Sequence, residues 1–174
     1  MLITPTYAAL NADLHISNPG YGASSGKWYS DVVRVIQETG AKSVLDYGCG
    51  KGHLFKMLQN HLSGISAMGY DPAIQKFSTL PEPADLVVCT DVLEHVEPEH
   101  LDAVLQHLRG LSKKAFCCYV ATRVGNKKLG DGRNAHLIVQ EDAWWENKLR
   151  AVFPTIGHKT TKKLKRRIFY WEAL

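Results

Sequence analysis

The sequence lacks the features that mark membrane, secreted and disulfide-rich proteins. No run approaches the roughly 18 apolar residues of a membrane-spanning helix, and residues 1–10 show no basic start followed by an apolar stretch. The four cysteines, Cys49, Cys89, Cys117 and Cys118, have neither metal-site nor disulfide-framework spacing. We therefore expect free thiols and a cytoplasmic protein, or one of the host cytoplasm if the chain is phage-encoded.

Internal repeats and low-complexity tracts are also missing. The 174 residues are 45% hydrophobic and 22% charged, which suits a single globular domain large enough to bury a core. We expect one domain over residues 1–174, in which residues 1–26 form an irregular N-terminal arm or lid and residues 27–174 form the core. The sequence does not indicate an oligomeric state.

The net charge is only +4, but it is unevenly distributed. The stretch 158–167, here called the basic C-terminal turn, holds much of the excess. A second basic group is Arg123, Lys127, Lys128 and Arg133. Such groups suit a polyanionic partner such as nucleic acid, or else they are solvated surface, and both interpretations stay open.

Apolar runs alternate with segments of helical periodicity. We expect strands at 43–47, 65–70, 84–90, 115–121, 154–158 and 167–173, and helices at 27–39, 53–62, 98–111 and 141–152. Strands that alternate with helices predict an α/β fold, with a Rossmann-like, doubly wound, mainly parallel sheet and helices on both faces. The last two strands predict a C-terminal antiparallel hairpin around the basic C-terminal turn.

The most informative stretch is Ser43–Gly52, an apolar run that leads through Asp46 into a loop with three alternating glycines. This order predicts a strand, a tight loop and a helix. The spacing G-x-G-x-G is not the G-x-G-x-x-G of nicotinamide enzymes, and Lys51 is not followed by the Ser or Thr of a phosphate-binding Walker loop. Since Asp46 would repel a pyrophosphate, it favours a ligand that carries an ammonium group.

Two more acids follow predicted strands. Asp71 comes about twenty residues after the glycine loop, where an acid can accept both hydroxyls of a ribose. Asp91 opens the segment Asp91–Val96, directly after the most apolar strand. Ligands of open α/β sheets bind at this carboxyl edge.

These three motifs, in this order, resemble those of class I S-adenosylmethionine-dependent methyltransferases, especially compact phage and bacterial forms. The resemblance covers about residues 28–173 and implies S-adenosylmethionine as cofactor. It implies that the cofactor-binding residues are Asp46, Tyr47, Gly48, Gly50, Gly52, Asp71, Pro72, Asp91 and Val92. The family's third strand has no room between Asp71 and residue 84, so we expect that region to be shortened and the adenine to lie near Phe77 and Leu80.

The candidate catalytic residues are Glu94, His95 and His136. If a helix begins at Asp91, then Asp91, Glu94 and His95 share one face, and His136 joins them from the next strand end. These four residues can hold a divalent metal, and they partly resemble the ligands of small-RNA 3′-terminal ribose 2′-O-methyltransferases. The alternatives are a general base acting on a hydroxyl or amine, which we favour over a metal, and a purely structural role.

The sequence thus predicts an S-adenosylmethionine-dependent methyltransferase with an unidentified acceptor. The basic groups favour nucleic acid over a small molecule as acceptor. The alternatives are a non-catalytic S-adenosylmethionine-binding regulatory protein and a metal-dependent RNA ribose 2′-O-methyltransferase. No membrane partner is expected.

Overall fold

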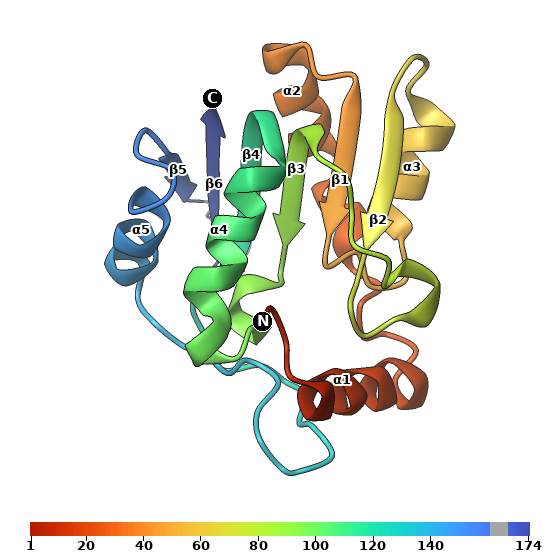
Figure 1. The fold of residues 1–174 in the computed structure, drawn as a ribbon, viewed down its shortest axis with the longest axis vertical. Coiled ribbons are helices and arrows are strands. Elements are labelled where there is room, and N and C mark those ends of the chain that lie inside the picture. Colours follow the sequence, from red (N-terminus) through yellow and green to blue (C-terminus); the bar gives the residue numbers. More distant parts are fainter. Residues whose placement is uncertain (161–166) are drawn as a thin grey trace.

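The computed structural model describes residues 1–160 and 167–174, which contain one six-stranded sheet (Figure 1). The strands are β1 (Ser43–Tyr47), β2 (Ser66–Tyr70), β3 (Ala84–Thr90), β4 (Ser112–Ala121), β5 (Gly157–Thr160) and β6 (Arg167–Ala173). Their order in the sheet is β2-β1-β3-β4-β6-β5. Strands β1 to β4 are parallel, and β6 runs antiparallel to both β4 and β5. The predicted mainly parallel sheet with a C-terminal antiparallel pair is confirmed.

The sheet ends at β2, because residues 71–83 form no strand. This segment holds only the short 3₁₀ turn η2 (Gln75–Phe77). Its three prolines, Pro72, Pro81 and Pro83, lack the N–H groups that a strand ladder needs. The expected shortening of the third-strand region is confirmed.

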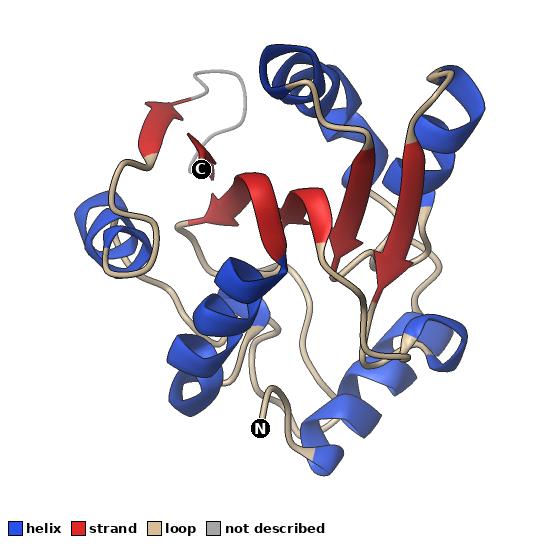
Figure 2. Ribbon diagram, turned by 45° about the horizontal axis from the view of Figure 1, so that its top comes forward, coloured by secondary structure: helices blue, strands red, loops and turns tan. Residues whose placement is uncertain are grey.

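Helices cover both faces of the sheet (Figure 2). They are α2 (Tyr29–Thr39), α3 (His53–His61), α4 (Leu101–Leu111) and α5 (Asp142–Arg150). Helices α2 and α3 pack on one face, and α4 and α5 pack on the other. Because successive strand residues point to opposite faces, Cys117 lies in the first core and Cys118 in the second. All four cysteines are free and buried, in agreement with the prediction.

The expectation of an irregular N-terminal arm is wrong for most of its length. Residues Pro5–Ser17 form helix α1, and the 3₁₀ turn η1 (Ser25–Trp28) precedes α2. The hydroxyl of Thr4 accepts the N–H of Tyr7 at 3.2 Å, and proline occupies the first helical position. The apolar residues of α1 are spread around the helix, so periodicity did not reveal it. Helix α1 lies across the carboxyl ends of β1 and β2 (Figure 1).

Smaller differences occur at other boundaries. Strand β4 begins three residues earlier than expected, and the first turn of the predicted helix 98–111 is the 3₁₀ turn η4 (Pro98–His100). Most of the basic C-terminal turn, residues 161–166, lies outside the described residues. In the described part of the chain, no helix is both long and apolar enough to cross a membrane.

Candidate functional site

A cavity of about 370 Å³ lies between α1 and the carboxyl ends of β1, β2 and β3. Its lining comes from the N-terminal arm, the glycine loop, the turn after β2, the segment after β3 and residues 123–136, together with Val104 of α4. Open α/β sheets bind ligands at this edge, and the volume suits a small-molecule ligand. Most of the predicted binding residues meet here, namely Tyr47, Gly48, Gly50, Asp71, Pro72, Asp91 and Val92.

The glycine loop is fixed to the end of β2 by backbone hydrogen bonds. The carbonyl oxygen of Tyr70 accepts the N–H groups of both Gly48 and Cys49, at 2.7 and 3.0 Å. The next residue, Gly50, donates its N–H to Oδ2 of Asp71 at 2.9 Å. The turns that follow β1 and β2 are therefore one connected unit.

Asp71 stands at the centre of this unit and lines the cavity. Its second oxygen, Oδ1, accepts the N–H of Ala73 at 3.0 Å. Burial raises the pKa of Asp71, whereas the N–H groups of Ala73 and Gly50 and the nearby ring of His15 lower it. Each carboxylate oxygen keeps further acceptor capacity, which suits the predicted contact with ribose hydroxyls.

The N-terminal arm rests directly on the glycine loop. The N–H of Lys51 donates to the carbonyl of Gly22 at 2.9 Å. The Lys51 ammonium reaches the carbonyl oxygens of Asn18 and Pro19, at 3.2 and 2.7 Å. Gly50 has φ +53°, and a Cβ there would lie 2.4 Å from the Gly22 oxygen. In the sequence Lys51 only excludes a Walker loop, and no local pattern indicates its contact with the arm.

Two predicted cofactor-binding residues, Asp46 and Gly52, do not line the cavity. Asp46 is only 1% exposed, and neither of its oxygens has a hydrogen bond of normal geometry within the described structure. Burial raises the pKa of Asp46 to about 7, and the nearby backbone N–H of Phe55 offsets part of this shift. The structure thus places Asp46 behind the loop, while its predicted contact with an ammonium group stays a prediction.

The adenine-side residues are also placed differently from the expectation. Phe77 packs edge-on against Phe55, with ring centroids 5.4 Å apart. Leu80 is 66% exposed, and neither Phe77 nor Leu80 lines the cavity. Pro72 and Ala73 occupy this side of the lining instead.

Asp91 adopts a left-handed backbone conformation with φ 55°. Its carboxylate accepts hydrogen bonds from the Lys27 ammonium at 2.7 Å and from the indole N–H of Trp28 at 3.3 Å. Only the short 3₁₀ turn η3 (Leu93–His95) follows, and not the helix that would place Asp91 on one face with Glu94 and His95. Asp91 therefore pairs with the segment before α2.

Glu94, His95 and His136 do come together, and one ligand atom from each lies within 4.8 Å of the others. Among the described residues, this is a set that can hold a metal ion, and Asp91 does not belong to it. Glu94 is fully buried and does not line the cavity. Its Oε1 accepts the N–H of Ala121 at 3.1 Å, and its carbonyl accepts the N–H of Ile138 at 3.0 Å. Glu94 thus fixes the end of β4 to the segment that carries His136.

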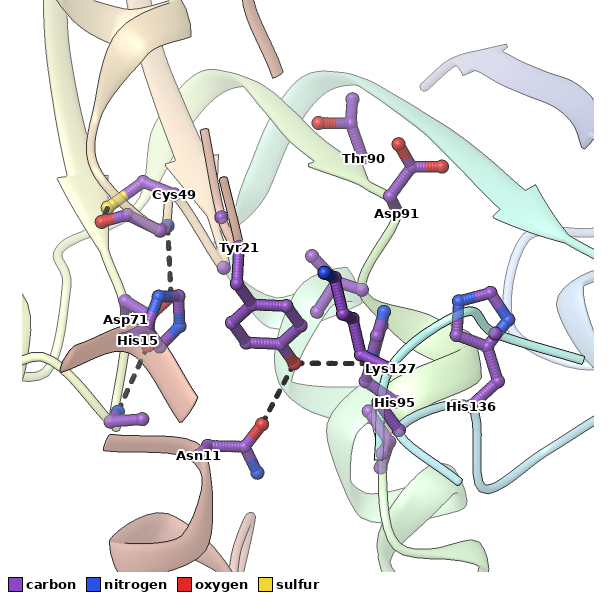
Figure 3. Close-up of a pocket in the computed structure, with 18 of the residues that line it drawn as sticks. Asn11, His15, Tyr21, Cys49, Asp71, Thr90, Asp91, His95, Lys127 and His136 are labelled. Carbon is purple, nitrogen blue, oxygen red and sulfur yellow. Dashed lines mark hydrogen bonds between the residues drawn. The ribbon is translucent and has the colours of Figure 1, made fainter. Parts of the chain in front are cut away.

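His95 and His136 both line the cavity, with ring centroids 4.7 Å apart and an edge-on orientation (Figure 3). Nδ1 of His136 lies 2.7 Å from the carbonyl oxygen of Arg123. Burial, together with the nearby His136, lowers the pKa of His95 to about 3. His95 is therefore a neutral imidazole at physiological pH.

Asn134 holds the loop that presents His136. Its Oδ1 accepts the N–H groups of Gly125 and His136, at 3.0 and 2.9 Å, and its Nδ2 donates to the Gly125 carbonyl at 2.8 Å. Sequence reasoning missed this residue. The available signal was an asparagine two positions before a histidine, a spacing that allows a local side-chain turn.

The comparisons with known proteins agree with this architecture. Residues 25–158 match the model of a family described as a methyltransferase domain. The structure is similar to an S-adenosylmethionine-dependent methyltransferase from Clostridium acetobutylicum ATCC 824, with a TM-score of 0.65, 14% identity and coverage of 94% of this chain and 98% of that one. It is similar to the methyltransferase domain of bacterial CtHen1-CN, with a TM-score of 0.64, 16% identity and coverage of 86% and 99%.

A third similar structure is an O-methyltransferase family protein from Burkholderia thailandensis, with a TM-score of 0.62 and 15% identity. The alignment covers 98% of this chain but only 62% of that one. A comparison with curated proteins gives no match.

The sheet order, the glycine loop and the acid after β2 define a class I methyltransferase fold. The chain belongs to the methyltransferase domain family, and its cofactor is S-adenosylmethionine. The cavity fits this group, because its volume suits a small molecule and Asp71 offers acceptor oxygens to a ribose.

Gly50→Ala should separate cofactor binding from simple backbone strain. Its Cβ would meet the Gly22 carbonyl, so the loop and the arm must move apart. We expect affinity for S-adenosylmethionine, measured by calorimetry, to fall at least tenfold. Gly40→Ala is the matched control, since Gly40 has φ +62° but no atom within 4 Å. It should cost about 1 kcal/mol of stability and leave affinity intact; equal affinity losses in both variants would contradict the prediction.

Asp46→Asn should change how stability depends on pH. Because the pKa of Asp46 rises from 3.8 to about 7 on folding, the folded state keeps a proton that the unfolded state loses between these values. Wild-type stability should therefore decrease as pH rises from 4 to 7, by a contribution on the order of 4 kcal/mol. Urea unfolding of Asp46→Asn should lack this contribution.

Asp85→Asn is the control for this experiment. The Lys42 N–H and the Lys114 side chain hold the pKa of Asp85 below its usual value. The contribution of Asp85 to the free energy of unfolding should therefore increase as pH rises. If the profiles of Asp46→Asn and the wild type are parallel between pH 4 and 7, the raised pKa of Asp46 is wrong.

Proposed function

We propose that this protein transfers the methyl group of S-adenosylmethionine to a hydroxyl group of an anionic acceptor, with His95 and His136 around the nucleophile. The observation that carries the proposal is the pair of imidazoles at the cavity wall. Neutral His95 has a ring nitrogen that can accept a hydrogen bond from a hydroxyl at physiological pH.

We propose a hydroxyl as the nucleophile because a hydroxyl must lose its proton during methyl transfer. The bound cofactor supplies an activated methyl group, so the protein has only to align the nucleophile and exclude water. A neutral amine attacks with its own lone pair, whereas a hydroxyl gains most from a base that takes its proton. Two neighbouring imidazoles are therefore better suited to an O–H than to an amine.

The anionic acceptor follows from the charge of the loop after β4. Arg123 and Lys127 line the cavity, and Lys128 is exposed beside them. The cavity lining holds three acids. Asp71 lies on the cofactor side, Asp91 pairs with Lys27, and Glu97 accepts two hydrogen bonds from Thr4. The acceptor side thus carries excess positive charge, which favours nucleic acid over a neutral small molecule.

Single substitutions should separate chemistry from cofactor binding. We expect His95→Gln and His136→Gln to lower kcat by about 10² or more, with unchanged affinity for S-adenosylmethionine. Asp71→Asn should do the reverse and weaken cofactor binding first. The assay follows isotopically labelled methyl transfer to RNA, DNA and small hydroxyl compounds. Cofactor binding without transfer to any acceptor would favour a regulatory protein, and transfer to amines alone would contradict the hydroxyl assignment.

Nucleic acid as acceptor predicts a strong dependence on salt. Lys127→Gln should raise KM and reduce the slope of log affinity against log salt by about 1. Lys113→Gln is the matched control, because Lys113 lies near the start of β4, at the opposite end of the sheet from the cavity. Salt-independent methylation of a small molecule would rule out the nucleic-acid acceptor. The basic C-terminal turn, with Lys162, Lys163, Arg166 and Arg167, is also predicted to contribute to this slope, and residues 161–166 lie outside the described structure.

A metal-dependent RNA ribose 2′-O-methyltransferase is the second candidate, favoured by the grouping of Glu94, His95 and His136. The two candidates differ in their metal requirement. Transfer that persists after chelation supports the metal-free base. Transfer that is abolished by chelation and restored by Mn²⁺ supports the second candidate.

A further inference from the structure

A chain of hydrogen bonds runs from α1 to the ring of His95 (Figure 3). Asn11 is 7% exposed, and its Nδ2 donates to the Tyr7 carbonyl at 3.1 Å. Because a carbonyl can only accept, this contact fixes the orientation of the Asn11 amide. Its Oδ1 then faces the Tyr21 hydroxyl, which donates to it at 3.0 Å.

The number of protons along this series of hydrogen bonds determines which ring nitrogen of His95 is protonated. A phenol carries one proton, and Tyr21 gives its proton to Asn11. Toward Nδ1 of His95, 3.3 Å away, the Tyr21 oxygen can therefore act only as an acceptor. The proton of this hydrogen bond must belong to His95.

We propose that Tyr21 and Asn11 are positioning residues that hold His95 in the tautomer with its proton on Nδ1. Nε2 is then the unprotonated nitrogen of the ring. This inference rests on the proposed function, in which His95 accepts a proton or hydrogen bond from the nucleophile. The tautomer itself can be observed without any methyl transfer.

His136 is held by the same logic. Its Nδ1 faces the Arg123 carbonyl at 2.7 Å, so this nitrogen carries the proton. Both imidazoles then carry their protons on Nδ1. A neutral His95 with its proton on Nδ1 agrees with the hydroxyl nucleophile proposed above.

One contact opposes the Nδ1–H tautomer of His95. The His95 ring also forms a hydrogen bond with the backbone of Ala135, which favours a proton on the ring nitrogen that faces this carbonyl. Removal of the Tyr21 oxygen leaves the Nδ1 proton without its acceptor, and the population of the Nε2–H tautomer increases. Removal of Asn11 frees the Tyr21 proton, which can then be donated to Nδ1. Both changes should therefore move the proton to Nε2.

The arm is thereby coupled to the chemistry. Asn11 belongs to α1, and Tyr21 adjoins Gly22, which Lys51 contacts on the glycine loop. His95 therefore holds this tautomer only while the arm is docked over the cavity.

Long-range ¹H–¹⁵N spectra of the full chain test the inference, because they distinguish the two imidazole tautomers. His95→Gln assigns the His95 signals. We expect the Nδ1–H form in the wild type, and a shift toward Nε2–H in Tyr21→Phe and in Asn11→Ala. Tyr7→Phe is the matched control, since the Tyr7 hydroxyl binds the backbone carbonyl of His95 and not its ring. It should leave the tautomer unchanged.

Kinetics complete the test with labelled methyl transfer. Tyr21→Phe should lower kcat at least tenfold with little change in the affinity for S-adenosylmethionine. A wild-type Nε2–H form, or an unchanged tautomer in Tyr21→Phe, would overturn the proposed role of Tyr21 and Asn11. If the tautomer shifts as expected but His95→Gln retains full transfer, Tyr21 and Asn11 do set the tautomer, and the proposed function fails.

Discussion

The hydrogen bond from the Gly50 N–H to the Asp71 carboxylate is the contact on which the rest of the cavity depends. It joins the turn after β1 to the turn after β2, and it also gives a buried carboxylate one of its donors. Without it, a charged group would remain buried with too few partners, at a cost of about 1–3 kcal/mol or more. Because Gly22 rests on Gly50, the arm is positioned by the same contact.

The elements that could be predicted are those whose signals are local. The strands show apolar runs of the right length, and the two turns show glycines or an acid directly after them. The shortened third-strand region was predictable because the residues between Asp71 and β3 cannot hold both a helix and a strand. Helix α1 was not predictable in this way, since its buried residues, Tyr7 and Asn11, include a polar one that only tertiary contacts explain.

Within the site, the sequence indicated which residues belong to the motifs but not which way their side chains point. Asp46 and Tyr47 are neighbours in a strand, so they face opposite sides of the sheet, and only Tyr47 lines the cavity. The grouping of Asp91 with Glu94 and His95 assumed a helix. The left-handed backbone at Asp91 instead turns its carboxylate toward Lys27 and Trp28. Such strain is characteristic of functional sites, and periodicity carries no signal for it.

The N-terminal arm explains how a short chain can serve both halves of a two-substrate site. One segment contacts the glycine loop through Gly22 and the His95 ring through Tyr21. Methyl transfer requires both halves to be aligned and dry at the same moment. If the same segment closes the cofactor side and sets the proton on the acceptor side, these two requirements are met by one movement. The residues with the least recognisable sequence pattern therefore link the glycine loop to the imidazoles of the proposed acceptor site.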